Sequence, residues 1–311
     1  MGLLTGLYYL LKPALPLRVR YSIRRLRAHY KLASTENWPV MESAGQKPPG
    51  WKGWPGGKEF AVVLTHDVEG MIGLERTLRL AALEKRLGFR SAFNFIPEGE
   101  YRVPEELRRE LVASGFEVGV HDLHHDGSLY RSHKAFEAAS TKINQYLKEW
   151  GAVGFRAGFM FHNLEWLKSL DIEYDASTFD TDPFEPQPDG VSTIFPFWVA
   201  GHRPGTGYVE LPYTLPQDST LFLIFRDDAS DLWKRKLDWV AAHGGMALLN
   251  VHPDYLAFDQ PASGPGEFPV EFYEQFLTYV WEKYAGAYWH GLPRDVARYI
   301  RAQHLGAEPG R

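Results

Sequence analysis

The sequence of 311 residues contains no cysteine. This absence excludes a disulfide framework, a thiolate metal site and a cysteine nucleophile. Any metal ion must therefore be bound by histidine and carboxylate side chains. For the same reason, the redox state of the compartment cannot be inferred from thiols.

The sequence also has a small net charge and few long apolar runs. The formal net charge of -5 is small for this length, so we expect no nucleic-acid partner. Residues 3–10 are apolar, but Lys12 and Pro13 interrupt the run and no basic segment precedes it. We therefore expect neither a signal peptide nor a membrane-spanning helix. The lack of an export signal favours a cytoplasmic location.

Three regions differ in composition. Residues 1–36 are a basic, partly apolar arm in which no acidic residue precedes Glu36. Such an arm is typical of a peripheral contact with the inner membrane surface, and the alternative is a basic helix packed on the domain. Residues 37–58 are rich in Pro, Gly and Trp, which predicts a linker whose tryptophans lie on the domain surface. Residues 59–311 are long enough for one large α/β domain.

From Phe60 onward, short apolar strands alternate with helical segments, which predicts an α/β fold with a parallel sheet or barrel. Phe60 to Leu64 is apolar without alternation, as in a strand covered on both faces. Further strands are expected at 91–96, 116–120, 153–155, 172–174, 193–199, 208–211, 221–225 and 246–251. Helices are expected at 74–87, 104–114, 132–150, 164–170, 231–243, 270–284 and 294–302, and a long loop at 178–192.

Five of the predicted strands run into ionisable residues: Asp67 and Glu69, His121 and His125, Arg156, Asp175, and His252. In a barrel these strand ends share one face, so residues far apart in sequence become neighbours. One carboxylate after a strand is more often a helix cap, but five such strand ends predict an active site. Arg156 and Asp175 are expected to form an ion pair, either tuning a catalytic base or purely structural.

The four-residue spacing of His121 and His125 would put both imidazoles on one side of a helical turn, within reach of one cation. Two histidines and a carboxylate with an open position compose a hydrolytic zinc site. His124 is a rival ligand, but it would diverge from His125 across the turn. His121 and His125 are therefore the preferred pair.

Metal-assisted hydrolysis also needs a base for the water and an acid for the leaving group. Asp67 and Glu69 can divide the roles of ligand and base between them. His252 is the expected acid.

At these residues the sequence resembles the polysaccharide deacetylase family, carbohydrate esterase family 4. Thr65-His66-Asp67-Val68-Glu69 is similar to the first family motif, Thr-Phe-Asp-Asp-Gly, with Val68 in place of a metal-binding Asp. His121-x-x-x-His125 matches the second motif. The other three motifs are matched more loosely, by Arg156-Ala157-Gly158 without its proline, Asp175-Ala176-Ser177, and Leu248 to His252.

The resemblance implies a distorted (β/α)7-type barrel and a divalent metal ion, zinc by default, bound by Glu69, His121 and His125. It implies that Asp67 is the general base and His252 the general acid, and that Arg156 and Asp175 complete the catalytic set. This resemblance spans Phe60 to about Tyr255.

The implied activity is hydrolysis of non-peptide carbon–nitrogen bonds, most often removal of the acetyl group from an N-acetylated sugar or glycan intermediate. The expected partner is thus a carbohydrate or a small amide. Two alternatives stay open: an amidohydrolase of a small cyclic or linear amide, and a non-catalytic carbohydrate-binding relative. The oligomeric state is not predicted.

Overall fold

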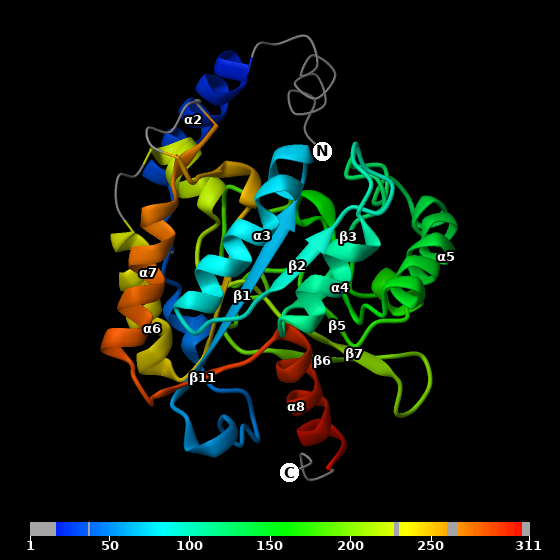
Figure 1. Ribbon diagram of the computed structural model, residues 1–311. Helices are drawn as coiled ribbons and strands as arrows, with labels where there is room; N and C mark the ends of the chain where they lie inside the picture. Colours follow the sequence, from blue (N-terminus) through cyan, green and yellow to red (C-terminus); the bar gives the residue numbers. More distant parts are fainter. Residues whose placement is uncertain (1–16, 37, 227–229, 260–265, 307–311) are drawn as a thin grey trace.

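The structure is a computed structural model that describes residues 17–36, 38–226, 230–259 and 266–306 (Figure 1). Its centre is a curled sheet in the order β11-β1-β2-β3-β4-β5-β7-β6, with β8 also paired to β1. All of these pairs are parallel except β6 with β7. The strands are β1 (Phe60–Val68), β2 (Ala92–Phe95), β3 (Glu117–His121), β4 (Gly154–Arg156), β5 (Tyr174–Asp175), β6 (Phe197–Ala200), β7 (Gly207–Glu210), β8 (Met246–Asn250) and β11 (Tyr288–His290).

Helices surround this sheet, and a short pair of strands, β9 (Leu256–Ala257) and β10 (Phe268–Pro269), lies apart from it. The helices are α2 (Leu17–Ala33), α3 (Met71–Arg86), α4 (Glu105–Ala113), α5 (His133–Trp150), α6 (Asp231–His243), α7 (Val270–Lys283) and α8 (Pro293–Leu305). Short 3-10 turns include η2 (Glu42–Gly45), η3 (Pro55–Gly57), η4 (Gly158–Met160), η5 (Trp166–Ser169) and η7 (Pro253–Tyr255).

The sheet curls into a distorted barrel, as predicted. After β7 the chain passes beside β8, where the backbone amides of Thr214 and Leu215 both donate to the carbonyl of Leu248. The Thr214 hydroxyl adds a bond to the Met246 carbonyl at 2.7 Å. Irregular backbone thus closes the barrel where a regular strand pair is missing, because these bonds satisfy the polar groups of the β8 edge.

Strand β1 is buried along its whole length, which confirms the predicted two-sided strand. Phe60, Val62 and Leu64 pack in the layer between the sheet and the outer helices. Ala61 and Val63 pack inside the barrel. Because side chains alternate along a strand, the odd-numbered positions that follow also face the interior.

The amino-terminal end of the barrel is filled by residues from the Trp-rich stretch. Trp54 is 4% exposed, and its indole nitrogen donates to the Gly244 carbonyl at 2.8 Å. It contacts the rings of Trp51 and Trp289 and shares a core cluster with residues of α8. This tryptophan is therefore part of the core and not laid on the surface, contrary to the expectation for residues 37–58.

One predicted strand is wrong. Residues 221–225 lie in a helical segment with π-type hydrogen bonds, η6 (Ser219–Phe225). The carboxylate of Asp218 caps its start by accepting from the Ser219 amide at 2.7 Å. A run of apolar residues without alternation fits a buried helical turn as well as a buried strand, so the pattern could not separate them. The predicted helix at 164–170 is reduced to the 3-10 turn η5, and β11 was not predicted.

Helix α2 packs on the domain at η6. The Arg25 guanidinium donates two hydrogen bonds to the Leu223 carbonyl, at 3.0 and 2.9 Å, and Ala28 is buried. The apolar run at 3–10 lies outside the described residues. Among the described helices, none is both long enough and apolar enough to cross a membrane.

Candidate metal and catalytic site

Two carboxylates at the end of β1 lie on the same side of the strand, facing the interior of the barrel. Asp67 lies within the strand, on the interior face, and Glu69 follows two positions later. Val68 points the other way and is fully buried in the outer apolar layer. A carboxylate at position 68 would therefore face an apolar core, and Glu69 is the residue placed to act as the ligand.

Glu69, His121 and His125 meet in space. Each offers one ligand atom, and these atoms all lie within 4.8 Å of one another. Nε2 of His125 is 3.3 Å from Oε1 of Glu69, and the two imidazole ring centres are 4.8 Å apart. The charge of Glu69 raises the pKa of His125 against the opposing effect of burial. A raised pKa means that His125 holds a proton beside Glu69. A metal cation bound between the two side chains would take the place of this proton.

His121 is oriented for binding a metal ion. Its Nδ1 lies 3.1 Å from the Arg156 carbonyl oxygen, which can only accept, so the ring proton belongs on Nδ1. Nε2 then carries the free lone pair. This atom is buried and has no hydrogen-bond partner in the described part of the chain. A buried, unpaired imidazole nitrogen beside a carboxylate fits a metal ligand.

The two histidines do not lie on a helical turn, which corrects the sequence prediction. Asp122 and His125 have φ values of 57° and 55°, in the left-handed region. The Asp122 carboxylate stabilises this bend by accepting from the amides of Leu123, at 2.6 Å, and Gly158, at 3.1 Å. His121 and His125 therefore meet through a side-chain-stabilised bend.

Gly158, the last residue of the third motif, allows the same bend. A Cβ atom at Gly158 would lie 2.7 Å from the Asp122 carboxylate and 2.7 Å from the His125 ring. Glycine at this position lets η4, which follows β4, approach the loop that contains the two histidines. The ring of Phe159 then stacks on His125, with centres 4.6 Å apart.

His124 takes no part in the cluster. Its Nδ1 lies 3.2 Å from the Glu98 carbonyl oxygen, and its Nε2 lies 3.6 Å from the Glu98 carboxylate. The side chain is exposed on the outside of the loop. The preference for His121 and His125 over His124 thus agrees with the geometry.

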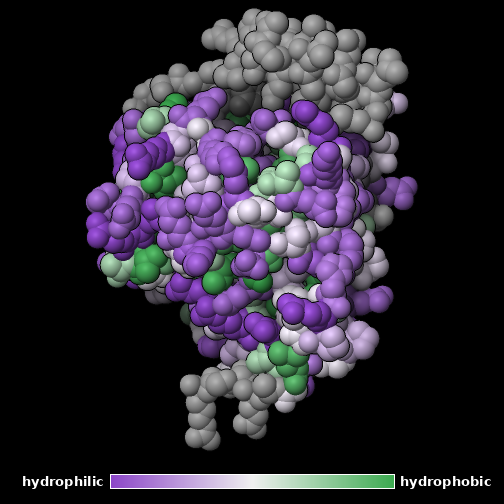
Figure 2. All heavy atoms as spheres, turned by 90° about the vertical axis from the view of Figure 1, so that its right-hand side faces the viewer, coloured by the Kyte–Doolittle hydropathy of each residue, from purple (hydrophilic) through white to green (hydrophobic). Residues whose placement is uncertain are grey.

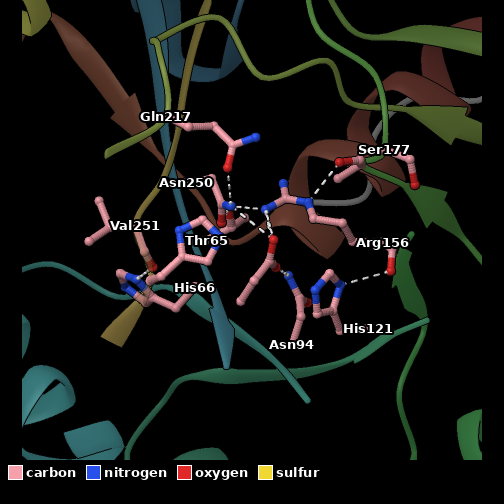
Figure 3. Close-up of polar contacts among 12 residues, drawn as sticks. Thr65, His66, Asn94, His121, Arg156, Ser177, Gln217, Asn250 and Val251 are labelled. Carbon is pink, nitrogen blue, oxygen red and sulfur yellow. Dashed lines mark hydrogen bonds and ion pairs between the residues drawn. The ribbon is translucent and has the colours of Figure 1, made fainter. Parts of the chain in front are cut away.

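Asp67 is held by four side-chain contacts from Asn94, Asn250 and Arg156, whose side chains converge in Figure 3. Its carboxylate accepts from the amides of Asn94 and Asn250, each at 2.9 Å, and lies 3.4 Å from Nη1 of Arg156 through either oxygen. Burial opposes ionisation, but the Arg156 guanidinium, with the hydrogen bond from Asn94, holds the pKa of Asp67 below its usual range. The carboxylate is therefore charged at neutral pH.

Glycine at position 119 allows one of these contacts. A Cβ atom there would lie 2.1 Å from Oδ1 of Asn94. Asn94 on β2 lies between the two neighbouring strands: its Nδ2 donates to Asp67 on β1, and its Oδ1 occupies the space that glycine leaves free at position 119 on β3.

Arg156 is fully buried, but its ion-pair partner differs from the one predicted. Its guanidinium donates to the Ala176 carbonyl at 2.7 Å and to the Thr65 hydroxyl at 2.8 Å, and it faces Asp67. Among the described residues there is no ion pair between Arg156 and Asp175. The arginine side chain crosses the barrel toward β1, and this direction takes its charge away from Asp175.

Asp175 is instead paired with a second carboxyl group. It lies opposite Glu210 on the neighbouring strand, and burial raises the pKa of both groups. The Ser177 hydroxyl donates to Asp175 at 2.7 Å and accepts from the Ala157 amide at 2.8 Å. The Ser177 hydroxyl thus links the Asp175 carboxylate to the backbone directly after Arg156.

His252 is paired with an aspartate that the sequence reasoning missed. Its Nδ1 donates to Oδ1 of Asp218 at 2.7 Å, and its backbone amide donates to Oδ2 at 2.7 Å. Burial disfavours the imidazolium, but the Asp218 carboxylate outweighs it and raises the pKa of His252 to about 10. Nε2 of His252 lies 3.8 Å from Oε1 of Glu69, so this imidazole lies beside the candidate metal site.

Asp254 and Tyr255, which follow His252 in the sequence, hold Glu69 in place. The sequence did not predict either role. The Tyr255 hydroxyl donates to Oε2 of Glu69 at 2.6 Å. The Asp254 carboxylate accepts from the Glu69 amide at 2.9 Å and from the Gly73 amide at 3.2 Å. The sequence His252-Pro253-Asp254-Tyr255 does contain these polar residues, but no spacing rule links them to Glu69.

The acids of the long loop at 178–192 brace the loop. The Tyr213 hydroxyl lies 2.9 Å from both Asp182 and Glu185, and Gln217 donates to Glu185 at 2.6 Å. Burial, reinforced by Glu185, raises the pKa of Asp182 to about 8, and burial also raises the pKa of Glu185. A proton held by this pair of carboxyl groups would relieve the repulsion between them. Gln217 also lies 3.4 Å from Asn250 and so connects the loop to the surroundings of Asp67.

No protein-family model matches the sequence, and no curated protein matches it. Among solved structures, a Mycobacterium smegmatis protein assigned to the polysaccharide deacetylases is similar, with 19% identity and a TM-score of 0.63. The match covers 85% of this chain and 97% of that one. The chain therefore has the polysaccharide deacetylase fold, which confirms the fold implied by the sequence motifs.

Two other structures are similar but superpose less closely. The family 4 carbohydrate esterase of Streptomyces lividans, solved with acetate, has 12% identity and a TM-score of 0.43, and the match covers 75% of this chain and 93% of that one. A family 4 pseudoenzyme of Bacillus anthracis has 14% identity and a TM-score of 0.46, with 76% and 65% covered.

Proposed function

We propose that this chain is a metal-dependent hydrolase of non-peptide carbon–nitrogen bonds that removes an acetyl group from an N-acetylated sugar or glycan intermediate. The observation that carries the proposal is the meeting of Glu69, His121 and His125 beside a buried carboxylate, Asp67, and a protonated imidazole, His252. Two nitrogen ligands and one oxygen ligand suit zinc and leave a position open. The fold shared with the Mycobacterium protein supports the sugar as substrate by analogy.

The metal site fits a divalent cation, which would polarise the amide carbonyl and lower the pKa of a water molecule. Tyr255 and Asp254 hold the Glu69 carboxylate in place for binding. The Arg156 carbonyl fixes the ring of His121 with Nε2 toward the cluster. These supporting contacts restrict the ligands to one geometry.

Asp67 is the general base of the proposed reaction. The water oxygen forms a bond to the carbonyl carbon while Asp67 accepts a proton from that water. Asn94, Asn250 and Arg156 orient the carboxylate, and Arg156 keeps it ionised. An ionised carboxylate held in this way is a weak base, so the water would need the lowered pKa that a bound divalent cation supplies.

His252 is the general acid. The bond from the carbonyl carbon to nitrogen breaks, and the imidazolium donates its Nε2 proton to the departing amine. Asp218 keeps the ring protonated at neutral pH and points Nε2 toward Glu69. The products are acetate and a free amino sugar.

A substrate screen tests the proposed class. The zinc-loaded chain is incubated with N-acetylglucosamine oligomers and, in parallel, with small cyclic imides. We expect release of acetate from the oligomers. Hydrolysis of the imides alone would replace the sugar with a small amide, and zinc binding without turnover of either would favour a binding protein.

A further inference from the structure

Helix α2 has an apolar stripe on its outer side. Ile23, Leu26 and Tyr30 are 43%, 77% and 81% exposed, although they are large apolar side chains. Their spacing places them on one side of the helix. The opposite side contains Arg25 and Ala28, which pack on the domain. The stripe therefore faces away from the protein.

Positive charge borders the stripe. Helix α2 has several basic residues and no acidic residue between Leu17 and Ala33. Arg27 lies next to the stripe on the helix surface and is exposed, whereas Arg24, also exposed, lies further round toward Glu185 of the long loop. Large apolar side chains flanked by arginine on a single helix match the interface between the headgroups and acyl chains of an anionic bilayer.

A second apolar patch lies at the same end of the molecule. Met71 and Ile72 begin α3 directly after the metal-binding segment, and they are 51% and 54% exposed. Helix α2 and the start of α3 both lie at the end toward which β1 points (Figure 1). The flank on the α5 side is mainly hydrophilic, with isolated apolar residues (Figure 2).

Helix α2 is also connected to the catalytic residues. Arg25 bonds to Leu223 in η6, and the residue that caps η6, Asp218, is the partner of His252. The ring of Phe225, at the end of η6, contacts His29 of α2 and Phe184 of the long loop. Helix α2, which presents the outer stripe, thus packs directly on η6, and η6 is connected to the candidate active site through Asp218.

We infer that the chain docks on an anionic lipid bilayer through the outer stripe of α2 and the first turn of α3, with the carboxyl end of the barrel facing the headgroups. Several apolar side chains together with basic ones supply the two signals that stable peripheral binding requires. Resting on the proposed function, this orientation assigns the substrate to glycans that are linked to a lipid. Such a substrate presents its amide at the headgroup level.

Vesicle sedimentation tests the docking without any turnover. The full-length chain is mixed with phosphatidylcholine vesicles with or without phosphatidylglycerol. The variant Ile23→Ser/Leu26→Ser/Tyr30→Ser is compared with a matched control, Val112→Ser/Trp281→Ser/Leu305→Ser, which removes exposed apolar side chains elsewhere. We expect binding that requires phosphatidylglycerol, a loss of about tenfold or more in the α2 variant, and no loss in the control.

Equal binding by the α2 variant and the unaltered chain would overturn the proposal, as would equal binding to neutral vesicles. Arg27→Glu tests the charge separately and should also weaken binding by about tenfold or more. For the substrate, the α2 variant should hydrolyse soluble N-acetylglucosamine oligomers like the unaltered chain but lose most turnover of an N-acetylglucosaminyl lipid in vesicles. Vesicle binding without hydrolysis of any acetylated sugar would leave the docking intact and refute the proposed function.

Discussion

Asp218 and His252 are joined by two hydrogen bonds of 2.7 Å, one from the imidazole and one from the backbone amide of the histidine. Asp218 belongs to the segment after β7, whereas His252 follows β8, so the pair couples two parts of the barrel wall. The two bonds fix both the position of the His252 backbone and the rotation of its ring. This pairing is the arrangement by which a carboxylate keeps an imidazole protonated and aimed.

Asp218→Asn should lower kcat by about a hundredfold or more, because it removes the charge that keeps His252 protonated. The pKa of His252, raised to about 10 by Asp218, should move toward its ordinary value. Since a general acid acts only when protonated, the loss of activity at alkaline pH should then begin at lower pH. The pH dependence of kcat checks this, with zinc content as the control, and an unshifted alkaline limb would contradict the role of Asp218.

His121→Ala should bind zinc more than about a hundredfold more weakly, since it removes one of three ligands. His124→Ala is the matched control because His124 is turned toward Glu98 on the outside of the same loop. Calorimetric titration of zinc into each protein measures both affinities. Equal affinities in the two variants would show that His121 is not a ligand.

Gly119→Ala should reduce activity about tenfold or more while leaving zinc binding nearly unchanged. The added Cβ would lie 2.1 Å from Oδ1 of Asn94 and would push that amide away from Asp67. Asn94→Ala removes the same contact without adding an atom, so it should give a similar loss of kcat. Full activity of both variants would mean that the Asn94 contact does not orient the base.

Glu117→Gln should change how stability depends on pH. Burial raises the pKa of Glu117 from its ordinary value of 4.5 to about 7, although Tyr174 and the Arg294 amide bond to its carboxyl group. A carboxyl group with a raised folded-state pKa contributes stability that is full below the unfolded-state pKa. This contribution is lost as pH rises through the folded-state pKa.

The advantage in unfolding free energy of the unaltered chain over Glu117→Gln should therefore shrink between pH 4.5 and about 7. Urea unfolding of both proteins across this range measures the difference. Parallel stability curves would show that Glu117 titrates normally in the folded chain.

The parts of the fold that follow from local pattern were predicted well. Strand β1 was predicted from an apolar run with covered faces, and the bounds predicted for α6, Asp231 to His243, are those of the structure. The meeting of Glu69, His121 and His125 followed from the rule that strand ends share one face of a barrel. These features depend on periodicity and topology, which a sequence carries directly.

The remainder depended on contacts between distant segments. In the sequence, Asp218 has the features of an ordinary helix cap. Its contact with His252 forms only because β8 lies beside this segment in the fold, and no spacing in the sequence predicts that contact. Arg156 was paired with Asp175 because their strands are neighbours, yet the long side chain crosses to Asp67. Side-chain direction inside a barrel is decided by packing, which one sequence alone does not show.

Release of acetate from N-acetylglucosamine oligomers tests the central claim most directly, when the zinc-loaded chain is compared with Asp67→Asn. The variant keeps all three metal ligands, so zinc content should be equal in both proteins, and acetate release should fall by about a hundredfold or more in the variant. Removing zinc from the unaltered chain with a chelator should abolish release. Equal release by the two zinc-loaded proteins, or undiminished release after zinc removal, would contradict the proposed metal-dependent hydrolysis with Asp67 as its base.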